Sequence, residues 1–148
     1  MFEKTAYFND SSNWENNTLY IGNHLIGVSK AYSGDFCIKN GTIVVADSAF
    51  DDASNITSIA VPASVVSFSA NNTMSLGEIV VDKENKFYTS DKNGVLFNKA
   101  MTELILFPAN ADVTEYIVPD TVEIIPSNAF MCLNLKSLII QNGIKVIE

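Results

Sequence analysis

The feature that most constrains the fold is a pattern that occurs twice, 80 residues apart. Phe50 and Phe130 both follow an alanine, and each stands five positions after an apolar residue. The same offset relates other apolar or aromatic positions: Tyr7-Phe8 to Phe87-Tyr88, Leu25 to Ile105, Phe36 to Tyr116, and Ile38 to Val118. A fixed internal period is the signature of a repeat architecture. We therefore predict that the chain is one unit of about 80 residues written twice, with Phe50 and Phe130 as equivalent buried core residues.

A shorter period lies inside each long unit. After each phenylalanine the apolar positions step by threes, with one alternation in the middle, at Ile59 and Val61 and again at Leu138 and Ile140. Alternation predicts a strand. Three prolines interrupt any long helical run: Pro62, Pro119 and Pro126. The steps of three fit tight turns in a solenoid coil of about 23 residues, within the range of known solenoid repeats.

Two segments interrupt the short period and predict hairpins. Residues 17–26 read as two strands about a Gly-Asn turn, which is a strong hairpin signal. Residues 94–108 read as a second hairpin with a longer loop. Each follows an aromatic pair and a polar loop, at 9–16 and at 89–93. Each long unit is therefore expected to run coil, hairpin insertion, coil.

These motifs resemble the BspA-like leucine-rich repeat family. The resemblance lies in residues 59–65 and 118–132, where an apolar strand ends in proline and leads through spaced valine and isoleucine to Ala-Phe and a nearby cysteine. Residues 82–99 match a hairpin-bearing variant of the family, and residues 12–22 a variant found in surface proteins of gut anaerobes. The resemblance implies a mostly β fold: a right-handed leucine-rich-repeat solenoid of short coils with β-hairpin insertions and little regular helix.

The repeat also bears on domain organisation. The pattern covers almost the whole chain, which predicts a single solenoid domain over residues 1–148. Both ends of the chain fall inside the pattern, and solenoids need polar caps on their terminal coils. We therefore expect the chain to be a piece of a longer repeat protein.

Charge and composition exclude several kinds of partner. The net charge is −8, from 17 acidic residues against 9 basic ones, and there is no arginine. Nucleic acids and anionic membrane surfaces both attract basic residues, so neither is an expected partner. No apolar run approaches the roughly 18 residues of a membrane span, so no membrane insertion is expected.

Residues that carry enzyme chemistry are sparse. His24 is the only histidine, and no cysteine or carboxylate cluster lies beside it at metal-ligand spacing. We therefore predict a protein that is not an enzyme and needs no cofactor or metal. One polar loop could offer oxygen ligands to calcium, although such residues are more often turn formers: Asp82, Glu84, Asp91 and Asn93. Cys37 and Cys132 are expected to be unpaired and mostly buried.

One column of outward-facing residues is the candidate binding site. Side chains alternate along a strand, so the residue between each inward pair must face solvent. The expected inward pairs are Ile59 and Val61, Ile79 and Val81, Ile105 and Phe107, Tyr116 and Val118, and Leu138 and Ile140. Stacking the coils aligns these residues: Cys37, Ala60, Val80, Leu106, Ile117 and Ile139. All are apolar, whereas the neighbouring column is mostly polar: Ser58, Glu78, Glu103 or Leu104, Glu115 and Ser137. The column predicts either a groove for a partner or a contact between copies, or it reflects only the strand preference of β-branched residues.

The family resemblance supplies the expected function. It implies a non-catalytic adhesion module of a secreted or cell-wall-attached bacterial protein, located outside the cell or on its surface. The partner would be a host or cell-surface protein, or a glycan. The alternative is a structural spacer between an anchor and another functional domain.

Overall fold

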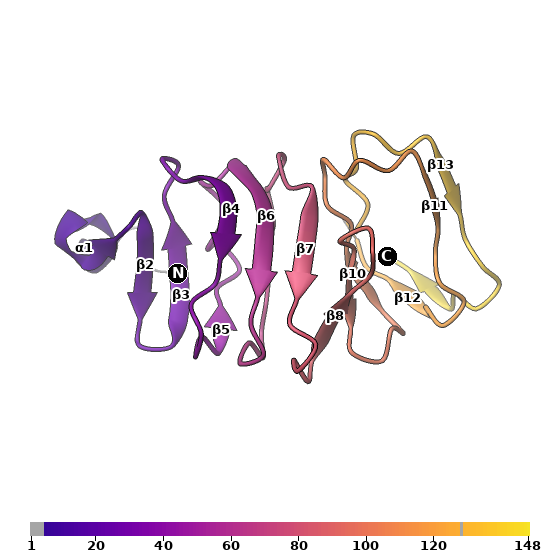
Figure 1. Cartoon of the computed structure of the whole chain (residues 1–148), viewed down its shortest axis with the longest axis horizontal. Helices are drawn as coiled ribbons and strands as arrows, with labels where there is room; N and C mark the ends of the chain where they lie inside the picture. The colour runs from indigo at the N-terminus through magenta and orange to yellow at the C-terminus, as the bar shows by residue number, and fades with distance from the viewer. Residues whose placement is uncertain (1–4, 128) are drawn as a thin grey trace.

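The computed structural model describes residues 5–127 and 129–148. Short coils are stacked side by side along the long axis of the molecule (Figure 1). The only helical elements described are α1 (Ala6–Asn9) and the 3₁₀ turn Ser11–Asn13. The expectation of a mostly β solenoid with little regular helix is confirmed, while the right-handed sense of the coils stays a prediction. No helix in the described part of the chain is long and apolar enough to cross a membrane.

Within the described residues, fourteen short strands form the coils and the insertions. They are β1 Trp14–Glu15, β2 Thr18–Ile21, β3 His24–Val28, β4 Ser33–Cys37, β5 Val44–Val45, β6 Asn55–Val61, β7 Glu78–Val81, β8 Tyr88–Ser90, β9 Leu96–Asn98, β10 Leu104–Leu106, β11 Glu115–Ile117, β12 Ile124–Ile125, β13 Ser137–Ile139 and β14 Val146–Ile147.

Successive coils pair through parallel strands. One three-stranded sheet has the order β4-β6-β7, and a two-stranded sheet pairs β11 with β13. On the other side of each coil, β5 pairs with β3, and β12 with β14. We call the solvent side of the sheets β4-β6-β7 and β11-β13 the front face. Parallel pairing at an interval of one coil is what the short period predicts.

Both predicted hairpins are present, and each has a strand that the sequence did not indicate. β2 and β3 pair antiparallel about Gly22, whose positive φ of 56° suits a tight turn. β9 and β10 likewise pair antiparallel. β1 adds to the edge of the first hairpin, and β8 adds to the second. The predicted loops at 9–16 and 89–93 are therefore wrong in part, because Trp14–Glu15 pairs with β2 and Tyr88–Ser90 pairs with β9.

The offset between the two long units is 80 residues in the coils but changes inside the second hairpin. Leu25 is fully buried, and its counterpart is the fully buried Leu104 rather than Ile105, which is half-buried. The strand pairing agrees. His24 pairs with Val44, and Glu103 bridges to Ile124, which is the counterpart of Val44. Leu25 and Leu104 are the next residues after His24 and Glu103. The offset is also 79 residues at the end of β10, where the backbone N–H of Phe107 donates to Ala129 as that of Val28 donates to Ala49. The predicted equivalence of Leu25 and Ile105 is therefore wrong by one residue.

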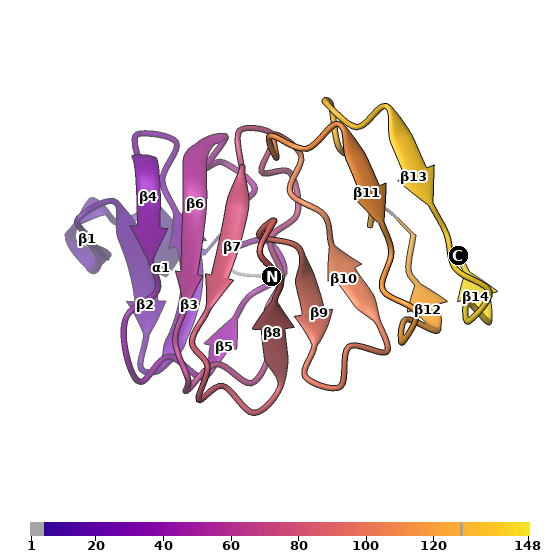
Figure 2. The ribbon, with the colours of Figure 1, turned by 45° about the vertical axis from the view of Figure 1, so that its right-hand side comes forward.

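The core is divided in two by the second insertion. One cluster packs β3 to β7 around Phe50, and the other packs the C-terminal coils around Phe107. The three-stranded sheet β8-β9-β10 lies between them (Figure 2). Alternation along β9 sends Leu96 into the first cluster and Phe97 into the second. We call this sheet the partition sheet.

Phe50 and Phe130 were expected to be equivalent core residues, and only the first is fully buried. Phe50 is 1% exposed, with the rings of Phe36 and Phe68 on either side at 5.4 and 6.4 Å. Phe130 is half-buried, and its ring contact is with Phe107 at 5.4 Å. The register of the repeat is right, but the expectation of equal burial is wrong.

Candidate interaction surface

The outward column predicted from the sequence is present on the front face. In the first sheet Cys37 is paired with Ala60, and Ala60 with Val80. In the second sheet Ile117 is paired with Ile139. Val80, Ile117 and Ile139 expose 51%, 57% and 51% of their surface, which is unusual for β-branched apolar side chains in a paired strand. Cys37 is exposed and Ala60 is half-buried.

Leu106 does not belong to this column, and its placement there is wrong. It lies at the end of β10 in the partition sheet, where it is half-buried against the first core cluster. Glu103 and Leu104 are likewise absent from the polar column, because they precede or begin the same strand. The β9-β10 hairpin has the same apolar spacing as a coil. Its strands pair antiparallel, so they do not join the parallel sheets of the front face.

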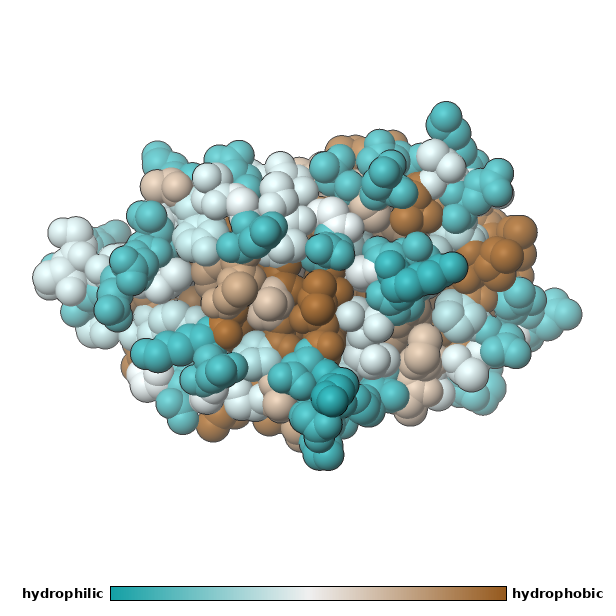
Figure 3. All heavy atoms as spheres, viewed as in Figure 1, coloured by the Kyte–Doolittle hydropathy of each residue, from teal (hydrophilic) through white to brown (hydrophobic). Residues whose placement is uncertain are grey.

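The column is therefore two patches rather than one. The N-terminal patch is Cys37, Ala60 and Val80, and the C-terminal patch is Ile117 and Ile139. Figure 3 shows hydrophobic residues gathered over β6 and β7 and again near β13, with hydrophilic residues between them. A single continuous groove across all coils is thus replaced by two separate surfaces.

The inward positions follow the prediction in β6 and β11, but not at Ile105, which lies in the partition sheet, or at the last strand. Ile59, Val61, Tyr116 and Val118 are all buried. Ile140, which was expected to face inward, is 44% exposed. β13 is the edge strand of its sheet, so no neighbouring strand covers this side chain in the described chain. Ile140 therefore lies in the predicted register, and it is exposed because β13 has a paired strand on one side only.

A polar row runs beside the apolar column, as predicted. Ser58 is paired with Asp35 and Glu78, and Glu115 with Ser137. The carboxylate of Asp35 accepts hydrogen bonds from the hydroxyls of Thr57 and Ser58, at 3.0 and 2.8 Å. The front face therefore combines an apolar middle row with an acidic upper edge.

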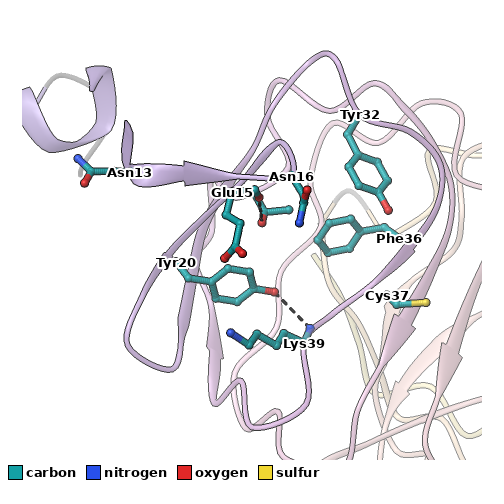
Figure 4. A pocket seen from close by; sticks show the side chains of 9 residues that line it. Asn13, Glu15, Asn16, Tyr20, Tyr32, Phe36, Cys37 and Lys39 are labelled. Carbon is teal, nitrogen blue, oxygen red and sulfur yellow. Dashed lines mark hydrogen bonds between the residues drawn. The ribbon is translucent and has the colours of Figure 1, made fainter. Parts of the chain in front are cut away.

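Two hollows meet on the N-terminal patch. The first, of about 460 Å³, is floored by Cys37, Ala60 and Val80 and edged by Lys39 and Asp82. The second, of about 400 Å³, lies between the first insertion and β4 (Figure 4). Its lining includes three aromatic rings and shares Cys37 and Lys39 with the first hollow: Tyr20, Tyr32 and Phe36. Together the hollows make one shallow path across β4, β6 and β7.

The aromatic end of this path is held by hydrogen bonds and ring contacts. The backbone N–H of Lys39 donates to the Tyr20 hydroxyl at 3.2 Å, and the Lys39 ammonium lies 5.9 Å from the centre of the same ring. Tyr32 packs edge-on against Phe36 at 5.0 Å, and its hydroxyl donates to the carbonyl of Asp35. These contacts fix the ring positions before any ligand arrives, which lowers the ordering cost of binding.

Two of the four loop residues considered as calcium ligands, Asp82 and Asp91, serve as turn formers. Asp82 accepts from the N–H of Glu84, and one oxygen of Asp91 accepts from two backbone N–H groups. The other oxygen of Asp91 accepts from the Tyr116 hydroxyl at 2.7 Å. Burial, reinforced by this carboxylate, raises the pKa of Tyr116 above its usual value. No group of three or more His, Cys, Asp or Glu side chains within the described ranges is placed to hold a metal ion.

The remaining reactive residues are isolated from one another. His24 is exposed, with Nδ1 3.3 Å from the carbonyl oxygen of Ile21. Cys37 and Cys132 are both free thiols. Cys132 is half-buried, but Cys37 is exposed, so the expectation of a mostly buried thiol is wrong there. The reason is alternation, because Phe36 and Ile38 on either side of Cys37 face the core.

Sequence reasoning missed Asn85, the most completely bonded side chain near the front face. It is fully buried, and its amide donates to the carbonyls of Pro62 and Val65 at 2.9 and 3.0 Å. Its oxygen accepts from the N–H groups of Phe87 and Tyr88. The available signal was its position 23 residues after Pro62, the length of one coil.

Comparison with known proteins identifies the repeat. Residues 105–148 match the family described as "BspA type Leucine rich repeat region (6 copies)". The chain has no significant match among curated proteins. It is similar to a leucine-rich repeat protein from Eubacterium ventriosum, at 29% identity and a TM-score of 0.70, over 77% of this chain and 31% of that one.

Two further solved structures share the fold. The pneumococcal vaccine antigen PcpA is 24% identical with a TM-score of 0.68, over 80% of this chain and 32% of that chain. A leucine rich cell surface protein from Faecalibacterium prausnitzii is 20% identical with a TM-score of 0.60, over 80% of this chain and 38% of the other. The chain spans about a third of the length of the solved structures it matches. Residues 105–148 of the chain carry a leucine-rich repeat region of the BspA type, which confirms the resemblance in the sequence pattern.

Proposed function

We propose that the chain is a non-catalytic, extracellular interaction and adhesion module of a secreted or cell-wall-attached bacterial protein, and that it binds through its front face. The observation that carries the proposal is the exposure of Val80, Ile117 and Ile139 in aligned positions of parallel strands. Neighbouring exposed apolar side chains, as in each of the two patches, mark an interaction site on a protein surface. The cell-surface description of the Faecalibacterium protein supports the extracellular location.

The proposal has a physical basis beyond exposure. Solenoid repeats present extended surfaces, and strands hold side chains in fixed positions. A partner that covers the column loses little entropy in ordering it, because the backbone is already paired on both sides at β6. A host or cell-surface protein, or a glycan, is the expected class of partner.

The test is a binding screen of the chain and two double variants against extracellular host proteins and glycans. Ile117→Thr with Ile139→Thr keeps β-branching and removes the exposed methyl surface of the C-terminal patch. Ile43→Thr with Val66→Thr is the matched control, because these residues are 40% and 42% exposed and lie beside β5, away from the front face. A third variant, Val80→Thr, addresses the N-terminal patch.

The front-face variants are expected to weaken binding of a captured ligand at least about tenfold, while the control pair binds like the parent. Unfolding midpoints, measured in parallel, should stay within a degree or two of the parent for all variants, as expected for surface changes. If every variant binds like the parent, the front face is not the binding surface. If the parent binds nothing in the screen, the spacer function is favoured instead.

A further inference from the structure

The N-terminal patch has a chemistry that narrows the choice of partner. We propose that it binds an extended peptide segment that carries apolar side chains with lysine or arginine as neighbours. This inference rests on the proposed function, since it assumes that the front face binds. Beyond the proposed function, it specifies the class of ligand and the part of the front face on which the ligand lies.

The shape of the surface suits an extended chain rather than a compact ligand. The two hollows share Cys37 and Lys39, so the path runs from Tyr20 across three strands to Val80. Strands in a sheet lie about 4.8 Å apart, and an extended peptide rises about 3.3 Å per residue. The crossing from β4 to β7 therefore takes about three residues, and the aromatic hollow beside β4 takes further residues at one end.

The charge around the path is negative and unneutralised. A third hollow, of about 430 Å³, lies along the acidic upper edge of the same face. The linings of the three hollows contain five carboxylates and two ammonium groups, all exposed: Glu15, Asp35, Glu78, Asp82 and Asp112, with Lys39 and Lys92. The one ion pair among the described residues joins Lys145 to Glu123, on a different part of the chain. The carboxylates of the front face are thus available to a cationic partner.

Charge complementarity favours this occupant over the alternatives. A second copy of the chain would bring a like-charged face, and the whole chain carries a net charge of −8, so self-contact through this patch is repulsive. Nucleic acid is repelled for the same reason. A purely cationic ligand would leave the apolar floor of Ala60 and Val80 unused. A segment with apolar and basic side chains would cover the apolar middle row and pair with the acidic residues beside it.

The geometry also says which groups meet. Apolar side chains of the segment would cover the middle row at Ala60 and Val80. Lysine and arginine side chains are long enough to keep their stems on apolar surface while their charged heads reach a flank. One flank offers Glu78 and Asp112, and the other offers Asp82. Each contact is solvent-exposed, so each contributes modestly and the set acts together.

The test uses three synthetic peptides of about eight residues and the full chain, with affinity measured by fluorescence anisotropy. The first peptide alternates lysine with valine, the second replaces lysine by glutamate, and the third replaces valine by serine. We expect the lysine-valine peptide to bind at least about tenfold more tightly than either of the others. Addition of salt should weaken it, because the flanking contacts are exposed.

Two variants locate the site and separate its two components. Val80→Thr should weaken the lysine-valine peptide about tenfold. Glu78→Gln with Asp112→Asn should weaken it severalfold and reduce the salt dependence; neither side chain makes a hydrogen bond whose loss would disturb the fold. Asp47→Asn with Asp52→Asn is the control for net charge, because both residues are exposed in the turns after β5, away from this face.

Each outcome decides the inference. Equal loss from the front-face and control charge variants would mean that binding follows net charge alone, and the inference is overturned. Preference for the glutamate or serine peptide, or no binding of any peptide, overturns it as well. If Val80→Thr weakens a ligand found in the screen but charge reversal of the peptides changes nothing, the inference fails and the proposed function survives. If Val80→Thr has no effect on any ligand, the N-terminal patch is not a binding surface.

Discussion

Phe50 and Phe130 occupy the same place in the two long units, yet they differ in burial. Phe50 has coils on both sides and is 1% exposed, whereas Phe130 is half-buried in the penultimate coil described. The same contrast separates Ile59, fully buried in the middle strand β6, from Leu138, half-buried in the edge strand β13. Burial in a solenoid is therefore set by the neighbouring coils as much as by the residue's own repeat position.

The two insertions show the same dependence on neighbours. Tyr88 opens the second insertion as a strand, and its hydroxyl donates to the carbonyl of Val66 and accepts from the N–H of Phe68 in the preceding coil. Phe8, 80 residues earlier, lies instead in the helix α1 and packs edge-on against Trp14 at 5.2 Å. One aromatic pair thus begins a strand where a coil precedes it and a helical turn where none is described.

The largest expected effect comes from truncating the two phenylalanines. Phe50→Ala should lower the free energy of unfolding by about 4 kcal/mol, since it leaves a cavity in a closed core. Phe130→Ala should cost about half as much, because part of its ring is already in water. Denaturant unfolding of both variants measures the difference. Equal losses would show that position in the stack does not govern burial energy.

The second effect concerns the contact between the second insertion and the coil before it. Asn85→Ala removes four hydrogen bonds from a fully buried position and should cost about 3 kcal/mol. Asn71→Ala is the control, because that residue is exposed and bonds only to the Ser69 hydroxyl at 3.1 Å. Thermal unfolding of the pair tests the claim, which a loss below about 1 kcal/mol at Asn85 would contradict.

The smallest effect is at the junction of the two cores. Tyr116→Phe removes the hydrogen bond to Asp91 and should cost about 1 kcal/mol at neutral pH. The folded state raises the pKa of this tyrosine above its unfolded value near 10, so the tyrosine stabilises the fold fully below pH 10. That contribution is lost as the pH rises further. The stability gap between parent and variant should therefore narrow above pH 10 in alkaline unfolding measurements, and a constant gap would contradict the assignment.

The periodicity of apolar residues was enough to predict the architecture and much of the surface. The alignment of Ala60 with Val80, and of Ile117 with Ile139, followed from strand alternation and one anchor per coil. The predicted register was wrong at Leu106, because the apolar spacing of the antiparallel hairpin resembles that of a coil. The prediction of burial failed at Phe130 and Ile140, because a repeat pattern does not show how many coils pack against a given coil. Asn85 was missed because a buried asparagine and a solvated turn asparagine look alike in sequence.

The partition sheet has a consequence for how the molecule comes apart. Disorder in a one-dimensional stack spreads from each coil to the next. Loss of the C-terminal coils would bring one side of this sheet into water, with the fully buried residues Val95, Phe97, Leu104 and Phe107. Its other side would stay dry against the first cluster, through Leu96 and the half-buried Ile105 and Leu106. We therefore expect local unfolding that starts at the C-terminal coils to stop at the partition sheet, so that the coils around Phe50 stay folded.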